Sequence, residues 1–177
     1  MLTIDRETSF LLIVDFQSRL MPAIFEGERA VANARRLIEA AKLLEVPALF
    51  TEQNAKGLGG TVPALAPDAA ALAHKMHFDA CREPDFLARL QGRTNIVVAG
   101  CEAHVCVQQT VLGLLDAGRK VYVARDALGA RHSESKETAI RRMERHGAEI
   151  VTAEMVVFEW LASADHPRFR EAVSLIK

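Results

Sequence analysis

The sequence lacks long apolar runs and a strong charge of either sign. Its 22 lysines and arginines nearly balance 23 aspartates and glutamates, which leaves a net charge of −1. A basic surface that would attract nucleic acid or an anionic membrane is therefore not expected. The apolar run at residues 10–14 is far too short to cross a bilayer. We expect no nucleic-acid partner and no membrane association.

Cysteine is also scarce, and export signals are missing. The chain has three cysteines, an odd number that does not suit a disulfide framework in a chain of 177 residues. Residues 1–17 lack the basic flank and small-residue cleavage site of a signal peptide. These features predict a cytoplasmic, reducing location, where a cysteine is catalytic, metal-bound or buried.

Internal repeats, low-complexity tracts and linkers are absent from the sequence. A chain of this length buries roughly 70% of its unfolded surface when it folds, enough for a substantial core. The sequence predicts a single domain over residues 1–177.

Short apolar runs alternate with longer stretches of helical period. The expected strands are 9–16, 47–52, 74–76, 94–100, 120–127 and 149–153, and the expected helices are 28–44, 84–91, 103–117, 133–146, 154–162 and 167–176. Ser133 is the expected N-cap of its helix, and the glycine- and proline-containing segment 53–68 is expected to be an ordered loop. The alternation predicts a three-layer α/β/α Rossmann-like fold, with a mainly parallel six-stranded sheet and helices on both faces.

Three polar or reactive side chains lie at or near the ends of expected strands. Asp15 ends the first, Lys75 lies close to the end of the third, and Cys106 follows the fourth. Ligands of such folds bind beyond the carboxyl ends of the strands, so the three are expected to share one crevice. Structural roles stay open: Asp15 as a loop cap, Lys75 as a buried ion-pair partner, and Cys106 as a small buried hydrophobe.

The segment GCEAHVCVQQT contains Cys101, His104 and Cys106, and three readings of it are possible. A zinc site is disfavoured, because structural zinc usually takes four ligands in two separated pairs. A disulfide requires the two Cα atoms to lie within about 7 Å of each other. The third reading is one reactive thiol at Cys106. In the first helical turn, free N–H groups and the helix dipole would favour its thiolate.

The motifs LLIVDFQ, HKMHF, GCEAHVCVQQTVLGLLDAG and KVYVARDA together resemble the isochorismatase-like cysteine hydrolases, a family that includes the nicotinamidases. The resemblance spans nearly the whole chain. The segments TEQ…LGGTVPAL, EAHVC and ADHPRFREAVSLIK are most similar to the subgroup named isochorismatase domain-containing proteins.

The resemblance implies a catalytic triad of Asp15, Lys75 and Cys106 that attacks a carbonyl or imine-like carbon. It also implies a cis peptide bond between Cys101 and Glu102. The backbone N–H groups of Glu102 and Cys106 would then form an oxyanion hole. A homo-oligomer is expected on the same ground.

The sequence also departs from the nicotinamidase pattern. Nicotinamidases hold a metal through Asp-x-His after the second strand, but FTEQNAKGLGG contains no histidine. We therefore expect no metal and no cofactor. Ala103-His104 stands where many relatives have Thr-Asp or Thr-Glu.

Gln17, His77 and His104 are further candidate substrate-binding residues. A packing role for His77 and a surface position for His104 stay open.

Two functions follow. One is an amidohydrolase that forms a thioester-type intermediate on a small molecule and cleaves an amide or related C–N bond. The other is a non-catalytic member of the same fold that binds a metabolite or a protein.

Overall fold

The computed structural model describes residues 2–177; Met1, the first residue of the expected domain, lies outside the described residues. The strands are β1 (Ser9–Val14), β2 (Ala48–Gln53), β3 (Leu72–Lys75), β4 (Asn95–Cys101), β5 (Lys120–Gly129) and β6 (Glu149–Val151). The helices are α1 (Gly27–Leu43), α2 (Ala55–Leu58), α3 (Phe86–Arg89), α4 (Gln108–Asp116), α5 (Ser133–Arg145), α6 (Ala153–Leu161) and α7 (Phe169–Ile176).

The six strands form one sheet in the order β3-β2-β1-β4-β5-β6, and every neighbouring pair is parallel. From β1 the chain first builds outward through β2 and β3, and then returns to place β4 on the other side of β1. This reversal creates a topological switch point between β1 and β4, where ligands of open α/β sheets bind.

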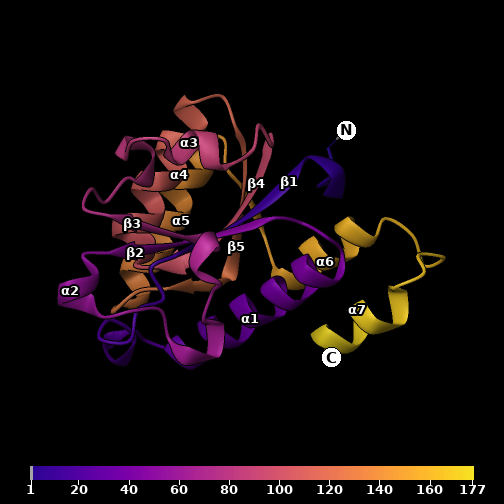
Figure 1. The fold of residues 1–177 in the computed structure, drawn as a ribbon, viewed down its shortest axis with the longest axis horizontal. Helices are drawn as coiled ribbons and strands as arrows, with labels where there is room; N and C mark the ends of the chain where they lie inside the picture. Colours follow the sequence, from indigo (N-terminus) through magenta and orange to yellow (C-terminus); the bar gives the residue numbers. More distant parts are fainter. Residues whose placement is uncertain (1) are drawn as a thin grey trace.

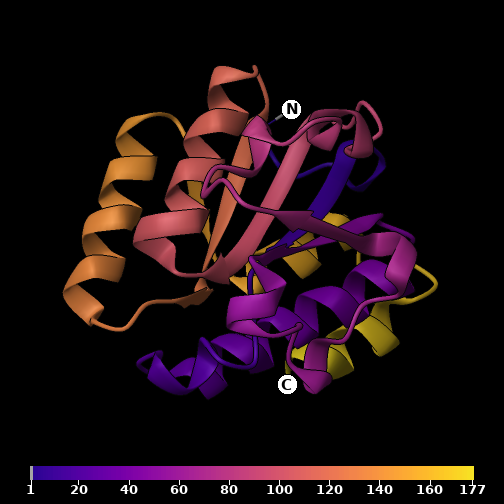
Figure 2. The same cartoon turned by 60° about the vertical axis from the view of Figure 1, so that its left-hand side comes forward.

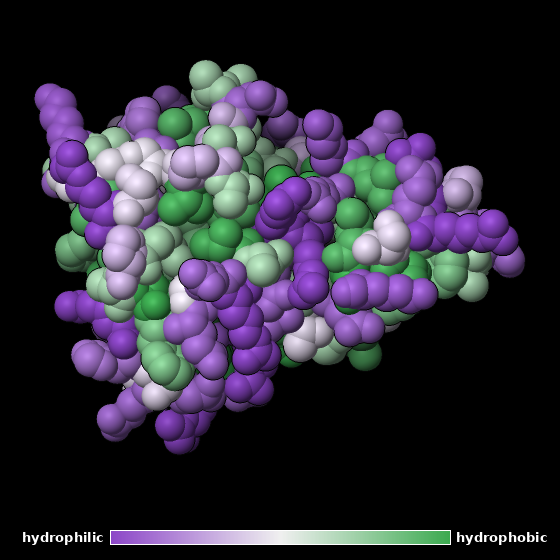
Figure 3. Space-filling view, turned by 90° about the horizontal axis from the view of Figure 1, so that it is seen from below, coloured by the Kyte–Doolittle hydropathy of each residue, from purple (hydrophilic) through white to green (hydrophobic). Residues whose placement is uncertain are grey.

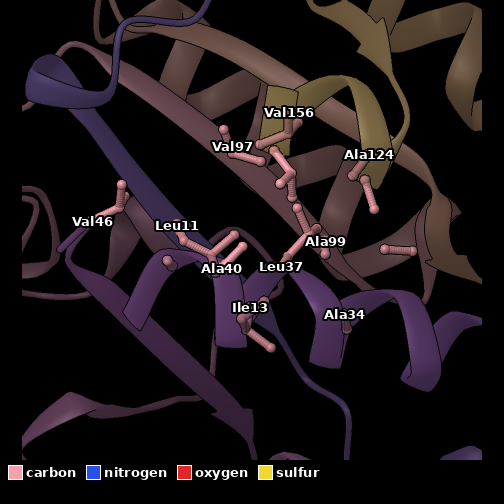
Figure 4. Packing of buried hydrophobic residues seen from close by; sticks show 14 of the residues in the cluster. Leu11, Ile13, Ala34, Leu37, Ala40, Val46, Val97, Ala99, Ala124 and Val156 are labelled. Carbon is pink, nitrogen blue, oxygen red and sulfur yellow. The ribbon is translucent and has the colours of Figure 1, made fainter. Parts of the chain in front are cut away.

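Helices cover both faces of the sheet, as expected (Figures 1 and 2). One apolar core joins α1, α6 and α7 to one face, and a second joins α3, α4 and α5 to the other. Figure 4 shows Ala34, Leu37 and Ala40 of α1 packed toward Leu11 and Ile13 of β1. The three-layer α/β/α prediction is confirmed, and the sheet is entirely rather than mainly parallel.

The end of the first strand and the content of the expected loop differ from the prediction. β1 ends at Val14 and not at residue 16, because Asp15 has a φ of 52°, a left-handed conformation that turns the chain out of the sheet. The expected loop at 53–68 contains α2 and a 3-10 turn over Pro63–Leu65.

Two helix predictions were wrong at their N-terminal ends. The expected helix 103–117 is divided into a single turn of π-helix over Ala103–Val107 and the regular helix α4. Val107 N–H donates to the Glu102 carbonyl five residues earlier, which widens this turn. The N-cap of α5 is His132, which is still extended, so Ser133 is already the first helical residue.

Gly100 allows β1 and β4 to approach closely beside the switch point. A Cβ atom at this position would lie 2.5 Å from the Val14 carbonyl oxygen and 2.6 Å from the Val14 Cβ. A larger residue would push the two strands apart at their carboxyl ends, next to Asp15 and to the turn after β4. Glycine is therefore required by the packing of these two strands.

Among residues 2–177, no helix is both long and apolar enough to span a lipid bilayer.

The packing of α1 against the sheet gives a stability prediction. Leu37 is fully buried in the core beneath α1, so Leu37→Ala should lower the free energy of unfolding by about 2–5 kcal/mol through lost transfer energy and a cavity. Leu2 is 89% exposed, and Leu2→Ala is the matched control, expected to change stability by less than about 0.5 kcal/mol. Urea denaturation of both variants measures the difference, and equal stabilities would contradict this packing.

Candidate functional site

Asp15 and Lys75 form a buried ion pair at the carboxyl ends of β1 and β3. As whole residues, Asp15 is 1% exposed and Lys75 is 3% exposed, and Lys75 Nζ lies 2.7 Å from Asp15 Oδ2. Thr51 Oγ1 donates a hydrogen bond of 2.7 Å to Asp15 Oδ1. Such a pair is stable only with close geometry and further hydrogen bonds, and this one has both.

The strand between them supplies the bonds that orient the ion pair. β2 lies between β1 and β3, and its Thr51 and Gln53 point to the pair from the end of that strand. Lys75 Nζ donates to Gln53 Oε1 at 2.7 Å and to two backbone carbonyls, those of His77 and Phe78, at 3.4 Å. Sequence reasoning missed Thr51 and Gln53, although a strand placed between the other two would have indicated them.

Cys106 lies in the π-helical turn that follows β4, on the other side of the switch point from Asp15. It is 7% exposed and is free of any disulfide. Burial and, to a smaller extent, the Asp15 carboxylate raise the pKa of the Cys106 thiol to about 12, although the Lys75 ammonium acts in the opposite direction. Both charged groups are thus close enough to the thiol to influence its pKa. The structure therefore brings the three residues together.

The expected thiolate-favouring environment is not found. Cys106 lies in a buried π-helical turn rather than in the open first turn of an α-helix, and desolvation is the largest influence on its pKa. The raised pKa favours the protonated thiol at neutral pH.

The Cys101–Glu102 peptide bond is cis in the structure. Glu102 then begins the turn that carries Cys106, and its carbonyl accepts hydrogen bonds from Val105 N–H at 3.0 Å and Val107 N–H at 3.3 Å. The Glu102 side chain is buried and bonded to Arg131.

Cys101 and Cys106 do not face each other. Cys101 belongs to the core on the α1 face of the sheet, whereas Cys106 belongs to the core on the α4 face. A shared zinc ion or a disulfide would need their sulfur atoms to meet, so neither fits this arrangement. Within residues 2–177, no cluster of three or more His, Cys, Asp or Glu side chains is arranged to hold a metal ion.

The remaining sequence candidates occupy different settings. Gln17 is fully buried and its amide binds backbone: Nε2 donates to the carbonyls of Gln53 and Gly59, and Oε1 accepts from Gln53 N–H. His77 is exposed and pairs with Glu83 at 2.9 Å. His104 is half-buried in the turn, and its Nδ1 has no hydrogen-bond partner among the described residues. Gln17 thus holds the loop after β2 in place, while His104 lies two residues from Cys106.

Comparison with known proteins identifies similar sequences over almost the whole chain. The Isochorismatase domain family matches residues 9–155. Isochorismatase domain-containing protein 2 of Xenopus laevis is 35% identical over 176 residues, which cover 98% of this chain and 85% of that protein.

Two solved structures extend the comparison to three dimensions. A structure titled MAR1 ribonuclease from Caenorhabditis elegans has a TM-score of 0.93 and 35% identity, covering 98% of this chain and 92% of that one. The YcaC gene product of Escherichia coli, titled an octameric hydrolase of unknown specificity, has a TM-score of 0.87 and 25% identity, covering 99% and 88%.

The contact between Asp15 and the thiol predicts the behaviour of an Asp15→Asn variant. The Asp15 carboxylate raises the pKa of Cys106, so removing its charge should lower that pKa, giving roughly three- to tenfold more thiolate at about pH 10. Thiolate absorbance measured over an alkaline titration, with Cys106→Ser as the blank, checks the shift. Circular dichroism verifies that the variant is folded; an unchanged or higher pKa in folded protein would show that Asp15 does not act on the thiol.

Proposed function

The chain belongs to the isochorismatase family, and we propose that it is a cysteine hydrolase that cleaves an amide or related C–N bond of a small molecule. The observation that carries the proposal is the buried Asp15–Lys75 ion pair next to the Cys106 thiol. In this assignment Cys106 is the nucleophile, Asp15 the base, and Lys75 the cation that orients Asp15 and balances its charge.

The reaction begins with a proton transfer. Asp15 takes the proton of the Cys106 thiol, and the sulfur attacks the carbonyl carbon of the substrate to form a tetrahedral oxyanion. The backbone N–H groups of Glu102 and Cys106 stabilise this negative oxygen. The C–N bond then breaks, the proton on Asp15 passes to the leaving nitrogen, and an acyl group remains on Cys106 as a thioester.

Water completes the cycle. Asp15, again ionised, takes a proton from water, whose oxygen attacks the thioester carbon. The C–S bond breaks, the acid product leaves, and Cys106 recovers its proton from Asp15. The high thiol pKa fits this scheme, because the proton leaves only when a substrate carbon is in place to accept the sulfur.

The proposed reaction uses no metal and no cofactor. The segment after β2, where the nicotinamidase pattern has its Asp-x-His ligands, contains no histidine between residues 51 and 61. In addition, Oε1 of Glu52, a carboxylate near the end of β2, accepts hydrogen bonds from Thr61 N–H at 2.6 Å and from Thr61 Oγ1 at 2.9 Å. We propose a single catalytic domain that acts in the cytoplasm.

Cleavage of RNA is a competing function, since a relative of 35% identity is titled a ribonuclease. The triad favours acyl chemistry, because a thiol with a neighbouring carboxylate is a nucleophile for carbonyl carbon. The near-neutral chain also lacks the excess of basic residues that holds a phosphate backbone. Incubation with labelled single-stranded RNA separates the two: RNA cleavage that survives Cys106→Ala would contradict the proposed hydrolase.

An acyl-enzyme trap tests the nucleophile. Brief reaction with p-nitrophenyl acetate and acid quench should leave one acetyl group on the peptide that contains Cys106, as seen by mass spectrometry. Cys106→Ala should abolish this adduct, whereas Cys81→Ala, which removes a half-buried thiol outside the proposed triad, should retain it. Asp15→Asn should lower the acetylation rate by about 100-fold or more, as expected for loss of a general base. Equal acetylation of the Cys106→Ala variant would refute the assignment.

We also propose that the chain forms a homo-oligomer. An apolar groove of about 780 Å³ lies along the outer face of α1, and its lining includes Met21, Pro22, Val31, Val62 and Pro63. Figure 3 views the side of the molecule that carries α1, where hydrophobic surface lies between hydrophilic side chains. The octameric hydrolase among the similar structures supports a second copy as the occupant of this groove.

Light scattering coupled to size exclusion should give a mass above 19.5 kDa, the mass of one chain. Val31→Glu, which introduces a charge into the groove, should shift the population toward the single chain, whereas Ala117→Glu, outside the groove lining, should leave it unchanged. A wild-type mass equal to one chain would exclude this assembly.

A further inference from the structure

The side chain of Glu102 ties the turn that carries Cys106 to the end of the neighbouring strand. Its Oε2 accepts two hydrogen bonds from Arg131, one from the backbone N–H at 3.1 Å and one from Nε at 3.0 Å. The Glu102 side chain is 9% exposed, whereas that of Arg131 is 55% exposed. The carboxylate is therefore held in a desolvated position, where hydrogen bonds to charged groups are strong.

The tie joins the ends of two adjacent strands. In the sheet Cys101 of β4 is paired with Gly129 of β5. Glu102 therefore lies just beyond the end of β4, and Arg131 lies just beyond the end of β5. The segment around Arg131 is itself anchored, because Phe25 N–H donates to the Ala130 carbonyl at 3.0 Å and α5 begins at Ser133, two residues after Arg131. Glu102 is thus fastened to a rigid part of the fold rather than to a free loop.

Glu102 is held at two of its functional groups. Its carboxylate is fixed by Arg131, and its carbonyl accepts the N–H groups of Val105 and Val107. The N–H of Glu102 lies in the Cys101–Glu102 peptide plane and its carbonyl in the Glu102–Ala103 plane, and the two planes meet at the Cα atom. Contacts that hold the side chain and the carbonyl restrain this Cα atom and so limit how the preceding plane, with the N–H, can turn relative to it. That N–H is a donor to the oxyanion in the mechanism above.

We propose that the Glu102 carboxylate is a positioning residue, which aims the oxyanion-binding N–H group through its bonds to Arg131. The inference rests on the proposed hydrolase function. It adds a side-chain role to a residue that the mechanism uses only through its backbone.

Two reactions of the same thiol separate this role from general structural support. Alkylation of Cys106 by iodoacetamide displaces iodide and forms no oxyanion, so it reports on the thiol, Asp15 and access to the site. Acetylation by p-nitrophenyl acetate passes through a tetrahedral oxyanion and also needs the N–H donors. Loss of the tie should therefore slow acetylation and leave alkylation nearly as it was.

The experiment compares rate constants for both reactions at Cys106, measured by mass spectrometry of the digested protein. Glu102→Ala should slow acetylation by about 30-fold or more, since misplacement of a catalytic donor by about 1 Å costs up to about 100-fold, while alkylation changes by less than about twofold. Both Arg131 bonds go to one oxygen, which the amide oxygen of Glu102→Gln can replace. Glu102→Gln should therefore recover acetylation to within about fivefold of the wild-type rate.

Arg131→Ala is the second variant, and it also serves if Glu102→Ala does not fold. It removes the Nε bond but keeps the backbone N–H bond, so its acetylation rate should lie between those of wild type and Glu102→Ala. The matched control is Arg125→Ala, which breaks the ion pair of Arg125 in β5 with Glu137 in α5 at 3.3 Å. This control should leave both rates unchanged.

The outcomes are distinguishable. If wild-type Cys106 is not acetylated at all, the proposed hydrolase function fails, and this inference fails with it. If wild type is acetylated and folded Glu102→Ala and Arg131→Ala match it, the positioning role alone is refuted. Equal losses of acetylation and alkylation in the variants would show that the tie merely supports the pocket, and would also refute the role.

Discussion

Asp15 and Lys75 bring opposite charges to 2.7 Å from each other in a place where each side chain is at most 1% exposed. Removing two such groups from water costs several kcal/mol per ion, which the attraction between them offsets only when their other polar atoms are also bonded. Thr51 and Gln53 supply these bonds from the strand in between. The ends of β1, β2 and β3 therefore depend on one another. Loss of Asp15, Thr51, Gln53 or Lys75 removes an ion-pair or hydrogen-bond partner from a buried charge.

The order of the strands decides what stands next to this ion pair. β4 returns to the side of β1, and Gly100 permits the two strands to approach until the backbone after β4 lies beside Asp15. Cys106, in the turn after β4, then lies on the opposite face of the sheet from Cys101, which ends β4 five residues earlier. The switch point of the sheet thus selects one of two neighbouring cysteines for contact with the charged pair.

The environment of Cys106 favours a protonated thiol over a permanently charged thiolate. Burial and the Asp15 carboxylate hold the pKa of Cys106 high, and Lys75 only partly counters them. A protonated, 7% exposed thiol resists oxidation and alkylation better than an exposed thiolate does. In the proposed mechanism the substrate itself completes the conditions for proton transfer, and the fixed N–H groups of the turn receive the charge that develops.

Hydrophobic periodicity in the sequence was sufficient to predict the alternating strands and helices, the parallel sheet and the approximate position of Asp15, Lys75 and Cys106 at strand ends. These features follow from local patterns, since apolar runs of strand length and helical spacing are visible along the chain. The sequence could not predict the π-helical turn, the left-handed Asp15 or the raised pKa of the thiol, because each depends on contacts between segments far apart in the chain. Thr51 and Gln53 are ordinary strand residues until β2 is placed between β1 and β3, and Glu102 is an ordinary glutamate until β5 brings Arg131 beside it. Residue types and their order were determined by the sequence alone, whereas the tertiary structure decided which polar groups share a desolvated space and so which of them act on one another.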